Sequence, residues 1–259
     1  MKVQTATGSL LGNRDENQDR LTVITRDDTV LAAVADGMGG HEGGALAAQT
    51  AVETFERLFN NLSLPVTDPK AILNEFLRSA HNAVVALGTT LSIGAAPRAT
   101  CVIALIQGNE ATWGHIGDSR VYLMRDGRVH ERTRDHSHVE VLLREGLITE
   151  QEYRTHPLRN YVEYCLGGEP GDPTLALSET HLLKANDQIL LCSDGVWSGI
   201  EDAELARTLS QPEALAGPQL ALIKLLQRAI ALCEPVADNT TAVLVNWLGL
   251  ASADTAGSA

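Results

Sequence analysis

The sequence predicts an α+β fold in which helices pack outside antiparallel β-sheets. Helical segments fall into two groups, early and late in the chain, and runs of strand-forming residues joined by tight turns lie between them. This order differs from the strand–helix alternation that builds parallel sheets. The 259 residues are 44% hydrophobic, enough to bury a substantial core, and no linker divides them. We expect a single domain over residues 1–248 and a disordered tail over residues 249–259.

Strand-forming residues dominate eight segments: 21–25, 29–36, 99–107, 110–118, 119–125, 128–133, 188–194 and 240–248. Three two-residue turns, at Asp27-Asp28, Gly108-Asn109 and Asp126-Gly127, join neighbouring segments as hairpins. The hairpins predict an antiparallel meander over residues 100–132.

Helical spacing of apolar residues marks residues 45–59. Asp68 is suited to cap a second helix, with Pro69 in its first turn, that continues to about Leu87. A long amphipathic helix is expected over residues 217–233. These helices would cover the outer faces of the sheets.

A polar helical segment at residues 135–168 interrupts the strands like an insertion. It contains a helical stretch that ends at Gly146, followed by the capping-box pair Thr149 and Glu152. We interpret this segment as a flap attached to the sheet core.

Composition narrows the classes of partner and the compartment. The formal net charge of −13 argues against nucleic acid or an anionic membrane, because both bind through Lys and Arg. Neither a signal peptide nor an apolar run of transmembrane length is recognisable. We therefore expect a cytoplasmic monomer whose cysteines are free thiols: Cys101, Cys165, Cys192 and Cys233.

Five short acidic residues recur at the ends of predicted strands, mostly beside Gly, Asn or Ser. They are Asp19, Asp36, Asp118, Asp194 and Asp238. Side chains at strand ends can converge on one cleft, where several ionised carboxylates would repel one another. Mg²⁺ or Mn²⁺ removes that conflict, since both ions prefer oxygen ligands. Two such ions can activate a water for attack on phosphorus.

Two other interpretations of these acids stay open at this point. Asp-Gly, Asp-Ser and Asp-Asn pairs are ordinary turn formers, so each residue taken alone could be structural. A glycosidase also uses paired carboxylates. The low aromatic content of 4% argues against sugar binding, and the repetition at strand ends argues against turns alone.

Five motifs in order resemble the metal-dependent protein serine/threonine phosphatases of the protein phosphatase 2C type, in their bacterial branch. They are GNRDENQD, VADGMGGH, GDSRVYLMRDG, LLCSDGVW and DNTTAVLV, and they span most of the chain. The resemblance implies a four-layer α-β-β-α sandwich, with two antiparallel sheets flanked by antiparallel helix pairs. It also implies that residues 135–168 are the family's flap.

The resemblance further implies a metal centre. Asp36 would bridge two Mn²⁺ or Mg²⁺ ions, the carbonyl of Gly37 would ligate one of them, and Asp194 and Asp238 would complete the pair. Asp118 would share a weaker third ion with Asp194.

Other residues would act around that centre. Arg14 would bind the substrate phosphate through its planar fork of donors, and Asp19 would hold a metal-bound water. His41 is a candidate general acid, although it could equally be a structural residue at the start of the following helix. Gln18 departs from the Glu of many relatives, which would weaken the hold on the second ion.

The expected activity is hydrolysis of phosphoserine and phosphothreonine in proteins by metal-activated water, opposing a bacterial Ser/Thr kinase. The alternative is a phosphoprotein-binding module with a dead site. The presence of Asp36, Asp194 and Asp238 favours the enzyme.

Overall fold

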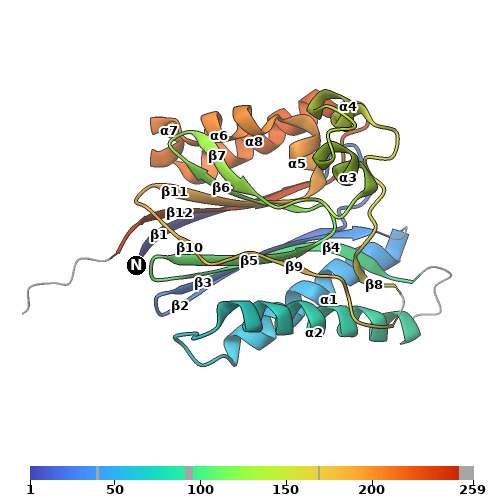
Figure 1. Ribbon diagram of the computed structural model, residues 1–259, viewed down its shortest axis with the longest axis horizontal. Helices are drawn as coiled ribbons and strands as arrows, with labels where there is room; N and C mark the ends of the chain where they lie inside the picture. The colour runs from blue at the N-terminus through green and yellow to red at the C-terminus, as the bar shows by residue number, and fades with distance from the viewer. Residues whose placement is uncertain (39–40, 91–95, 169, 251–259) are drawn as a thin grey trace, which may run out of the picture.

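The computed structural model describes residues 1–38, 41–90, 96–168 and 170–250; the side chains of residues 41 and 42 lie outside this description. Four layers are visible in Figure 1: two helices, two β-sheets, and a second group of helices. The α-β-β-α sandwich implied by the sequence is therefore confirmed. The expected disordered tail lies outside the described residues from residue 251 onward.

The strands form two antiparallel sheets. The first has the order β1-β12-β11-β6-β7, and the second has the order β10-β5-β4-β3-β2, with β8 beside β4 and β9 beside β5. The strands are β1 (Lys2–Leu10), β2 (Asp19–Arg26), β3 (Thr29–Met38), β4 (Arg98–Gln107), β5 (Glu110–Ile116), β6 (Arg120–Arg125), β7 (Arg128–Arg132), β8 (Leu166–Gly167), β9 (Ala176–Leu177), β10 (His181–Leu182), β11 (Asp187–Cys192) and β12 (Thr240–Gly249). Sequence patterns missed β1, which pairs with β12 along its whole length.

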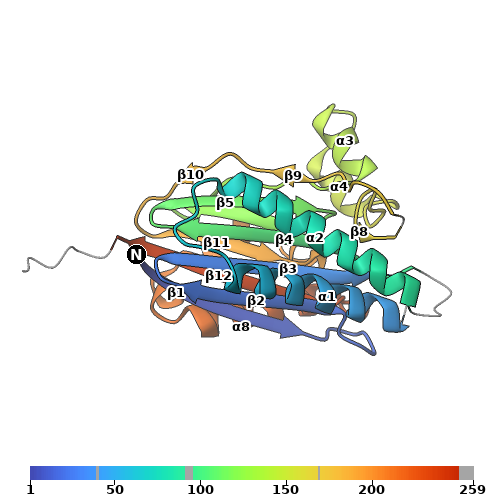
Figure 2. The ribbon, with the colours of Figure 1, turned by 90° about the horizontal axis from the view of Figure 1, so that it is seen from below.

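Helices cover both outer faces of the sandwich. They are α1 (His41–Asn60), α2 (Pro69–Thr90), α3 (His138–Arg144), α4 (Glu150–Thr155), α5 (Asp194–Gly199), α6 (Asp202–Leu209), α7 (Pro212–Ala216) and α8 (Pro218–Cys233). Figure 2 shows α1 and α2 side by side across the sheet that contains β2 to β5. On the other face α8 packs with the short helices α5, α6 and α7, so this layer is more than a simple pair. No helix in the described ranges is long and apolar enough to span a membrane.

Three apolar clusters fill the spaces between layers. One joins α1 and α2 to their sheet around Phe55 and Phe76, and a second lies between the two sheets around Trp113. The third packs α5, α6 and α8 against the five-stranded sheet around Trp197 and Leu222. The central strands β3, β4, β11 and β12 are buried on both faces, which explains why they read as almost continuous apolar runs.

The predicted meander over residues 100–132 is wrong in one respect. Its strands β4 and β5 belong to one sheet, whereas β6 and β7 belong to the other. The chain changes sheet at Gly117, whose φ of +97° suits glycine and whose missing Cβ would lie 2.5 Å from Thr100. Local patterns could not reveal this change because both hairpins have the same sequence signature.

The flap segment carries α3 and α4. Ser137 caps α3, and Thr149 and Glu152 form the capping box expected from the sequence. An isolated bridge between Ser137 and Val162 closes its base. The flap therefore leaves the sandwich and returns to it at neighbouring points.

Candidate metal centre

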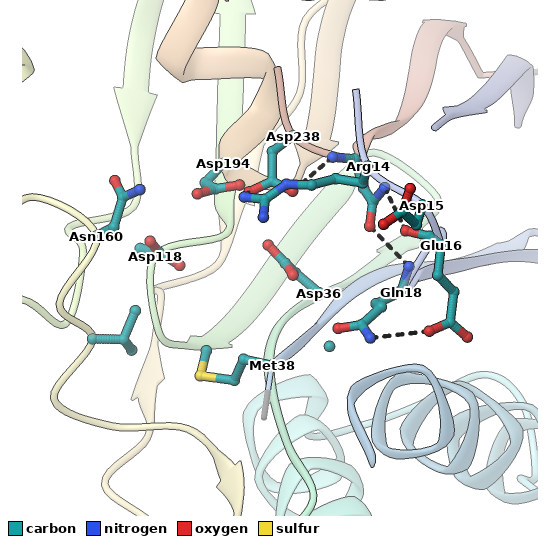
Figure 3. Close-up of a pocket in the computed structure, with 13 residues that line it drawn as sticks. Arg14, Asp15, Glu16, Gln18, Asp36, Met38, Asp118, Asn160, Asp194 and Asp238 are labelled. Carbon is teal, nitrogen blue, oxygen red and sulfur yellow. Dashed lines mark hydrogen bonds and ion pairs between the residues drawn. The ribbon is translucent and has the colours of Figure 1, made fainter. Parts of the chain in front are cut away.

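Four of the five predicted acids line one cleft of about 440 Å³: Asp36, Asp118, Asp194 and Asp238. Figure 3 shows that their side chains converge from separate segments of the fold. These four acids thus share one cleft, whereas Asp19 does not line it. Gly37 and Arg14 also line this cleft.

The sheet register and one helix start place these acids. Asp36 lies near the end of β3, directly opposite Asp19 on β2. Asp118 occupies the turn between β5 and β6, where the chain changes sheet. Asp194 is the first residue of α5, and Asp238 precedes β12. Both sheets and the loops between them therefore contribute to the cleft.

The carboxylates lack cationic partners sufficient to offset their burial. Burial, followed by the charges of Asp19, Asp194 and neighbouring acids, raises the pKa of Asp36 well above its usual value. The pKa of Asp194 is raised in the same way, by burial and then by Asp118 and Asp238. Burial and nearby Asp135 raise the pKa of Asp118 to about 7. These neighbouring carboxylates therefore need bound protons or cations to offset their burial and mutual repulsion.

The donors fit divalent metal ions by their chemistry. Oδ1 of Asp194 is buried without a hydrogen-bond partner, so an oxygen ligand is available in the cleft. Among the described side chains, no three His, Cys, Asp or Glu groups are already gathered around one ion position. The convergence on one cleft nevertheless fits metal binding, because backbone carbonyls and water supply further ligands and carboxylates can rotate toward an ion.

Arg14 lies beside Asp238 at the mouth of the cleft. Its Nη2 donates to Oδ2 of Asp238 at 2.7 Å, and both side chains retain solvent contact. Arg14 therefore lines the cleft, as expected of a phosphate ligand, but one of its amino groups binds a cleft carboxylate. Sequence patterns gave no sign of this pairing, which joins residues 224 positions apart.

Asp19 takes a different place from the other acids. It is buried, the hydroxyl of Ser193 donates to its Oδ2 at 2.7 Å, and the structure does not place it among the described residues that line the cleft. Burial is the main cause that raises its pKa to about 6. Its contact with Ser193 links β2 to the residue before Asp194.

Gly37 allows two backbone segments to approach each other. A Cβ at this position would lie 2.1 Å from the carbonyl oxygen of Gly44 in α1, so a side chain cannot fit there. This contact explains the glycines at positions 37 and 44. The candidate His41 begins α1, but its side chain lies outside the described part of the structure.

Several residues at the cleft were not singled out from the sequence. Asn160 and Val162 line it from the flap. The side chain of Asn239 accepts from the backbone N–H of Gln18 and donates to the carbonyls of Leu11 and Glu16, which holds the loop that carries Arg14. The neighbouring Asp238-Asn239 pair was the available signal, but the partners of Asn239 are more than 200 residues away.

The chain belongs to the protein phosphatase 2C family, whose family model matches residues 9–249. Over 243 residues it is 32% identical to the serine/threonine protein phosphatase PstP of Mycobacterium tuberculosis, covering 90% of this chain and 42% of PstP. It thus spans less than half the length of that relative.

Two further comparisons cover nearly the whole of both chains. Protein phosphatase PhpP of Streptococcus pneumoniae is 29% identical over 235 residues, with 90% of this chain and 92% of PhpP covered. A structure of the PstP catalytic domain in complex with two manganese ions matches with a TM-score of 0.75 and 30% identity, covering 94% of this chain and 97% of that one. The fold and family inferred from the sequence are confirmed.

Proposed function

We propose that this chain hydrolyses phosphoserine and phosphothreonine in proteins and uses Mn²⁺ or Mg²⁺ as its cofactor. The convergence of Asp36, Asp118, Asp194 and Asp238 on one cleft carries this proposal. Family membership and the two manganese ions of the PstP catalytic domain support it.

The proposed ligand roles follow the sequence resemblance and agree with the placement of the side chains. Asp36 would bridge two ions, with Asp194, Asp238 and the carbonyl of Gly37 completing their coordination. Asp118 would share a third, weaker ion with Asp194. When bound, the ions supply an activated water and neutralise charge on the phosphate. The raised pKa values of Asp36 and Asp194 are consistent with acids that need a cation.

The protein itself would orient the phosphate and help to deliver a proton to the leaving oxygen. Arg14 would turn from Asp238 to a phosphate oxygen, since a guanidinium binds either group through the same donors. Asp238 would thereby become free to bind a metal ion. Asp19, held by Ser193, would orient water from a position behind Asp36. The proton for the leaving oxygen would come from His41 or from water near Asp118.

The partners and location form a further part of the proposal. A separate Ser/Thr kinase would supply the phosphoproteins, and the chain would act as a monomer in the cytoplasm. The support for the compartment is chemical: the four cysteines are free thiols, and Cys101 and Cys192 are buried.

Phosphate release from a phosphoserine peptide tests the activity. Wild-type protein should release phosphate with Mn²⁺ or Mg²⁺, lose this activity in EDTA, and regain it when Mn²⁺ is restored. Asp36→Asn is the matched control, because it keeps the side-chain shape but removes the proposed bridging charge. Full activity in EDTA would overturn the metal-dependent function.

A further inference from the structure

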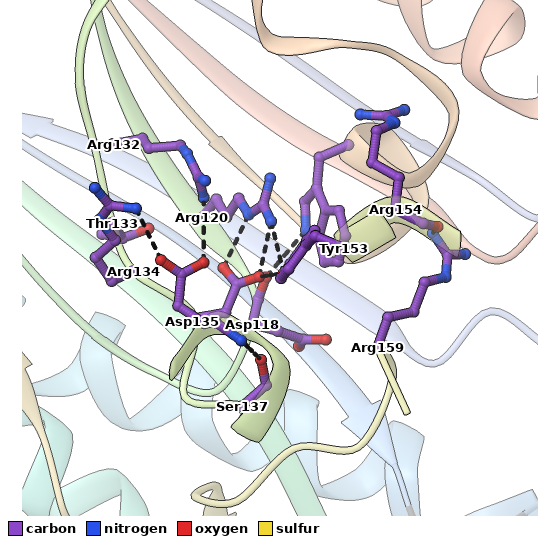
Figure 4. A network of polar contacts seen from close by, with 12 residues as sticks. Asp118, Arg120, Arg132, Thr133, Arg134, Asp135, Ser137, Tyr153, Arg154 and Arg159 are labelled. Carbon is purple, nitrogen blue, oxygen red and sulfur yellow. Dashed lines mark hydrogen bonds and ion pairs between the residues drawn. The ribbon is translucent and has the colours of Figure 1, made fainter. Parts of the chain in front are cut away.

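A fully buried arginine lies beside the cleft, at the start of β6. Nε of Arg120 donates to Oδ1 of Asp135 at 2.8 Å, and Nη2 donates to Oδ2 at 2.7 Å. Nη2 also donates to the hydroxyl of Tyr153 at 3.0 Å, and that hydroxyl donates to Asp135. Figure 4 shows these three side chains pointing toward one another. With Trp197 they form what we call the Arg120 cluster.

The Arg120 cluster reaches two of the acids that line the cleft. The guanidinium carbon of Arg120 lies 3.8 Å from the ring centre of Trp197, a close cation–π contact. The indole N–H of Trp197 donates to the backbone carbonyl of Asp118 at 3.0 Å. Asp194 lies three residues before Trp197 in α5. One stacked pair therefore connects the segments that carry Asp118 and Asp194.

The same cluster reaches the flap from two sides. Asp135 begins the flap segment, and Tyr153 belongs to α4 within it. His136, the residue after Asp135, donates its backbone N–H to the carbonyl of Gly117 at 2.9 Å. Its own carbonyl accepts from the backbone N–H of Glu163 at 2.8 Å. Val162, beside Glu163, lines the cleft. A continuous set of contacts therefore runs from the cleft wall through the flap base to the turn that carries Asp118.

Separating the flap base from Arg120 would cost free energy, because it would break a buried pair of opposite charges. Arg120 and Asp135 are buried, so moving the flap base away would take from the guanidinium the carboxylate that binds two of its nitrogens and leave only Asp202, 3.9 Å from Nη1. An unpaired buried charge is costly, whereas the intact pair is satisfied on both sides by hydrogen bonds. Flap motion that separates Asp135 from Arg120 is therefore disfavoured, and the flap base and the Asp118 turn would move together.

We infer that Arg120 is a positioning residue that holds the flap base in a fixed relation to Asp118 and Asp194. It touches neither substrate nor metal ion; it acts through Asp135, Tyr153 and Trp197. Its effect on turnover rests on the proposed phosphatase function, whereas its effect on local motion does not. The two effects can be measured separately.

Amide hydrogen exchange on the metal-free protein tests the coupling without any assay of activity. Tyr153→Phe removes one hydroxyl and keeps the ring. Exchange should accelerate about tenfold, the change expected on losing one buried hydrogen bond, both in α4 and at residues 117–119 and 195–198. Acceleration confined to residues 150–155, or none at all, would overturn the inference.

A charge-free double variant separates positioning from stability. Arg120→Met with Asp135→Leu replaces the ion pair by apolar groups, a change that often preserves stability. Exchange in the flap and at residues 117–119 should rise, and kcat for a phosphoserine peptide should fall by about tenfold, since the Asp118 turn loses its support. Mn²⁺ affinity, measured by calorimetry, should change little.

The chain offers a matched control at the other end of β6. Arg125 binds Asp187 through Nε at 2.8 Å and Nη2 at 2.6 Å, the same two-pronged geometry. Arg125→Met with Asp187→Leu should leave flap exchange and kcat at wild-type values. Equal effects from the two double variants would show that Arg120 acts only on general stability and would overturn its positioning role. If the wild-type protein releases no phosphate, the proposed function fails while the exchange experiment still decides this inference.

Discussion

An acid at one end of the sheets has a charge partner within the protein, whereas three acids at the other end have none among the described residues. At the end away from the cleft, Asp187 is 1% exposed, and Arg125 and the backbone N–H of Lys184 donate to its carboxylate. At the cleft end, no ion pair within the described residues joins Asp36, Asp118 or Asp194 to a cation. A buried carboxylate whose partners are supplied by the protein contributes to the stability of the fold. Carboxylates left to face one another require a cation from outside, and this requirement indicates a functional site.

Replacing Asp36 should have the largest effect on activity, and it should change activity and stability in opposite directions. Asp36→Asn should lower phosphate release by about 10³-fold or more, because metal ions supply several kcal/mol of the catalysis. The metal-free variant should melt at a higher temperature than wild type, since one of several repelling charges is gone. Calorimetric Mn²⁺ titration and thermal melting check both parts. A variant that binds Mn²⁺ normally would remove Asp36 from the metal centre.

Asp118 should differ from Asp36 although both line the same cleft. Asp118→Ala should retain about two metal ions per chain at moderate Mn²⁺, because its proposed ion is the weaker third one. Turnover should fall by about 10²-fold, as expected when an acid–base contribution is lost. Metal titration beside steady-state kinetics is the measurement. Loss of the tight ions would place Asp118 in the central pair, and normal turnover would make it a turn residue.

Replacing Asp187, at the opposite end of the sheets, should lower the stability of the protein and leave its activity unchanged. Asp187→Asn leaves the guanidinium of Arg125 without its charge partner and should destabilise the protein by about 3 kcal/mol. The melting temperature should fall by about 6–12 °C, given the size of the domain. Activity per folded molecule at 25 °C should remain at the wild-type level. A large loss of turnover with unchanged stability would contradict the separation of the two ends.

Stability of the metal-free protein should depend on pH through the cleft acids. The folded protein raises the pKa of Asp118 to about 7, so it holds this proton more tightly than the unfolded chain does. Stability from this group is present at low pH and is lost as the pH rises through about 7. Burial lowers the pKa of His81, His115 and His136, so these groups add stability as the pH rises over the same range. The contribution of Asp118 is therefore measured as a difference: between pH 6.5 and 8 the melting temperature of the metal-free wild type should fall relative to that of Asp118→Ala, by about 2–4 °C per kcal/mol.

Two comparisons sharpen the pH experiment. Mn²⁺ should raise the melting temperature most at pH 8, where the cleft acids are charged. Asp118→Ala should show a smaller fall, or a larger rise, than the wild type over the same range without metal. Parallel pH dependences of the wild type and Asp118→Ala in EDTA would show that the protein already compensates the charge of Asp118.

Much of the secondary structure could be predicted from neighbouring residues. Asp68 caps α2 as expected, with its Oδ1 accepting from Ala71 at 3.0 Å. The turn at Asp126-Gly127 has positive φ angles of 51° and 72°. Hairpins, caps and amphipathic helices depend on residues a few positions apart, so their signals are present in short windows. Helix α6, with only 8 residues, was not predicted, because so short a segment repeats its apolar spacing barely twice.

The sequence by itself determined which acids could form a site and where several hairpin turns and helix caps lie. Only the tertiary structure decided that β5 and β6 lie in different sheets, that Arg14 pairs with Asp238, and that Arg120 binds the flap through Asp135. The reason is physical. Each of these outcomes depends on which distant segments become neighbours when apolar surfaces are buried, and a short stretch of sequence does not specify those neighbours.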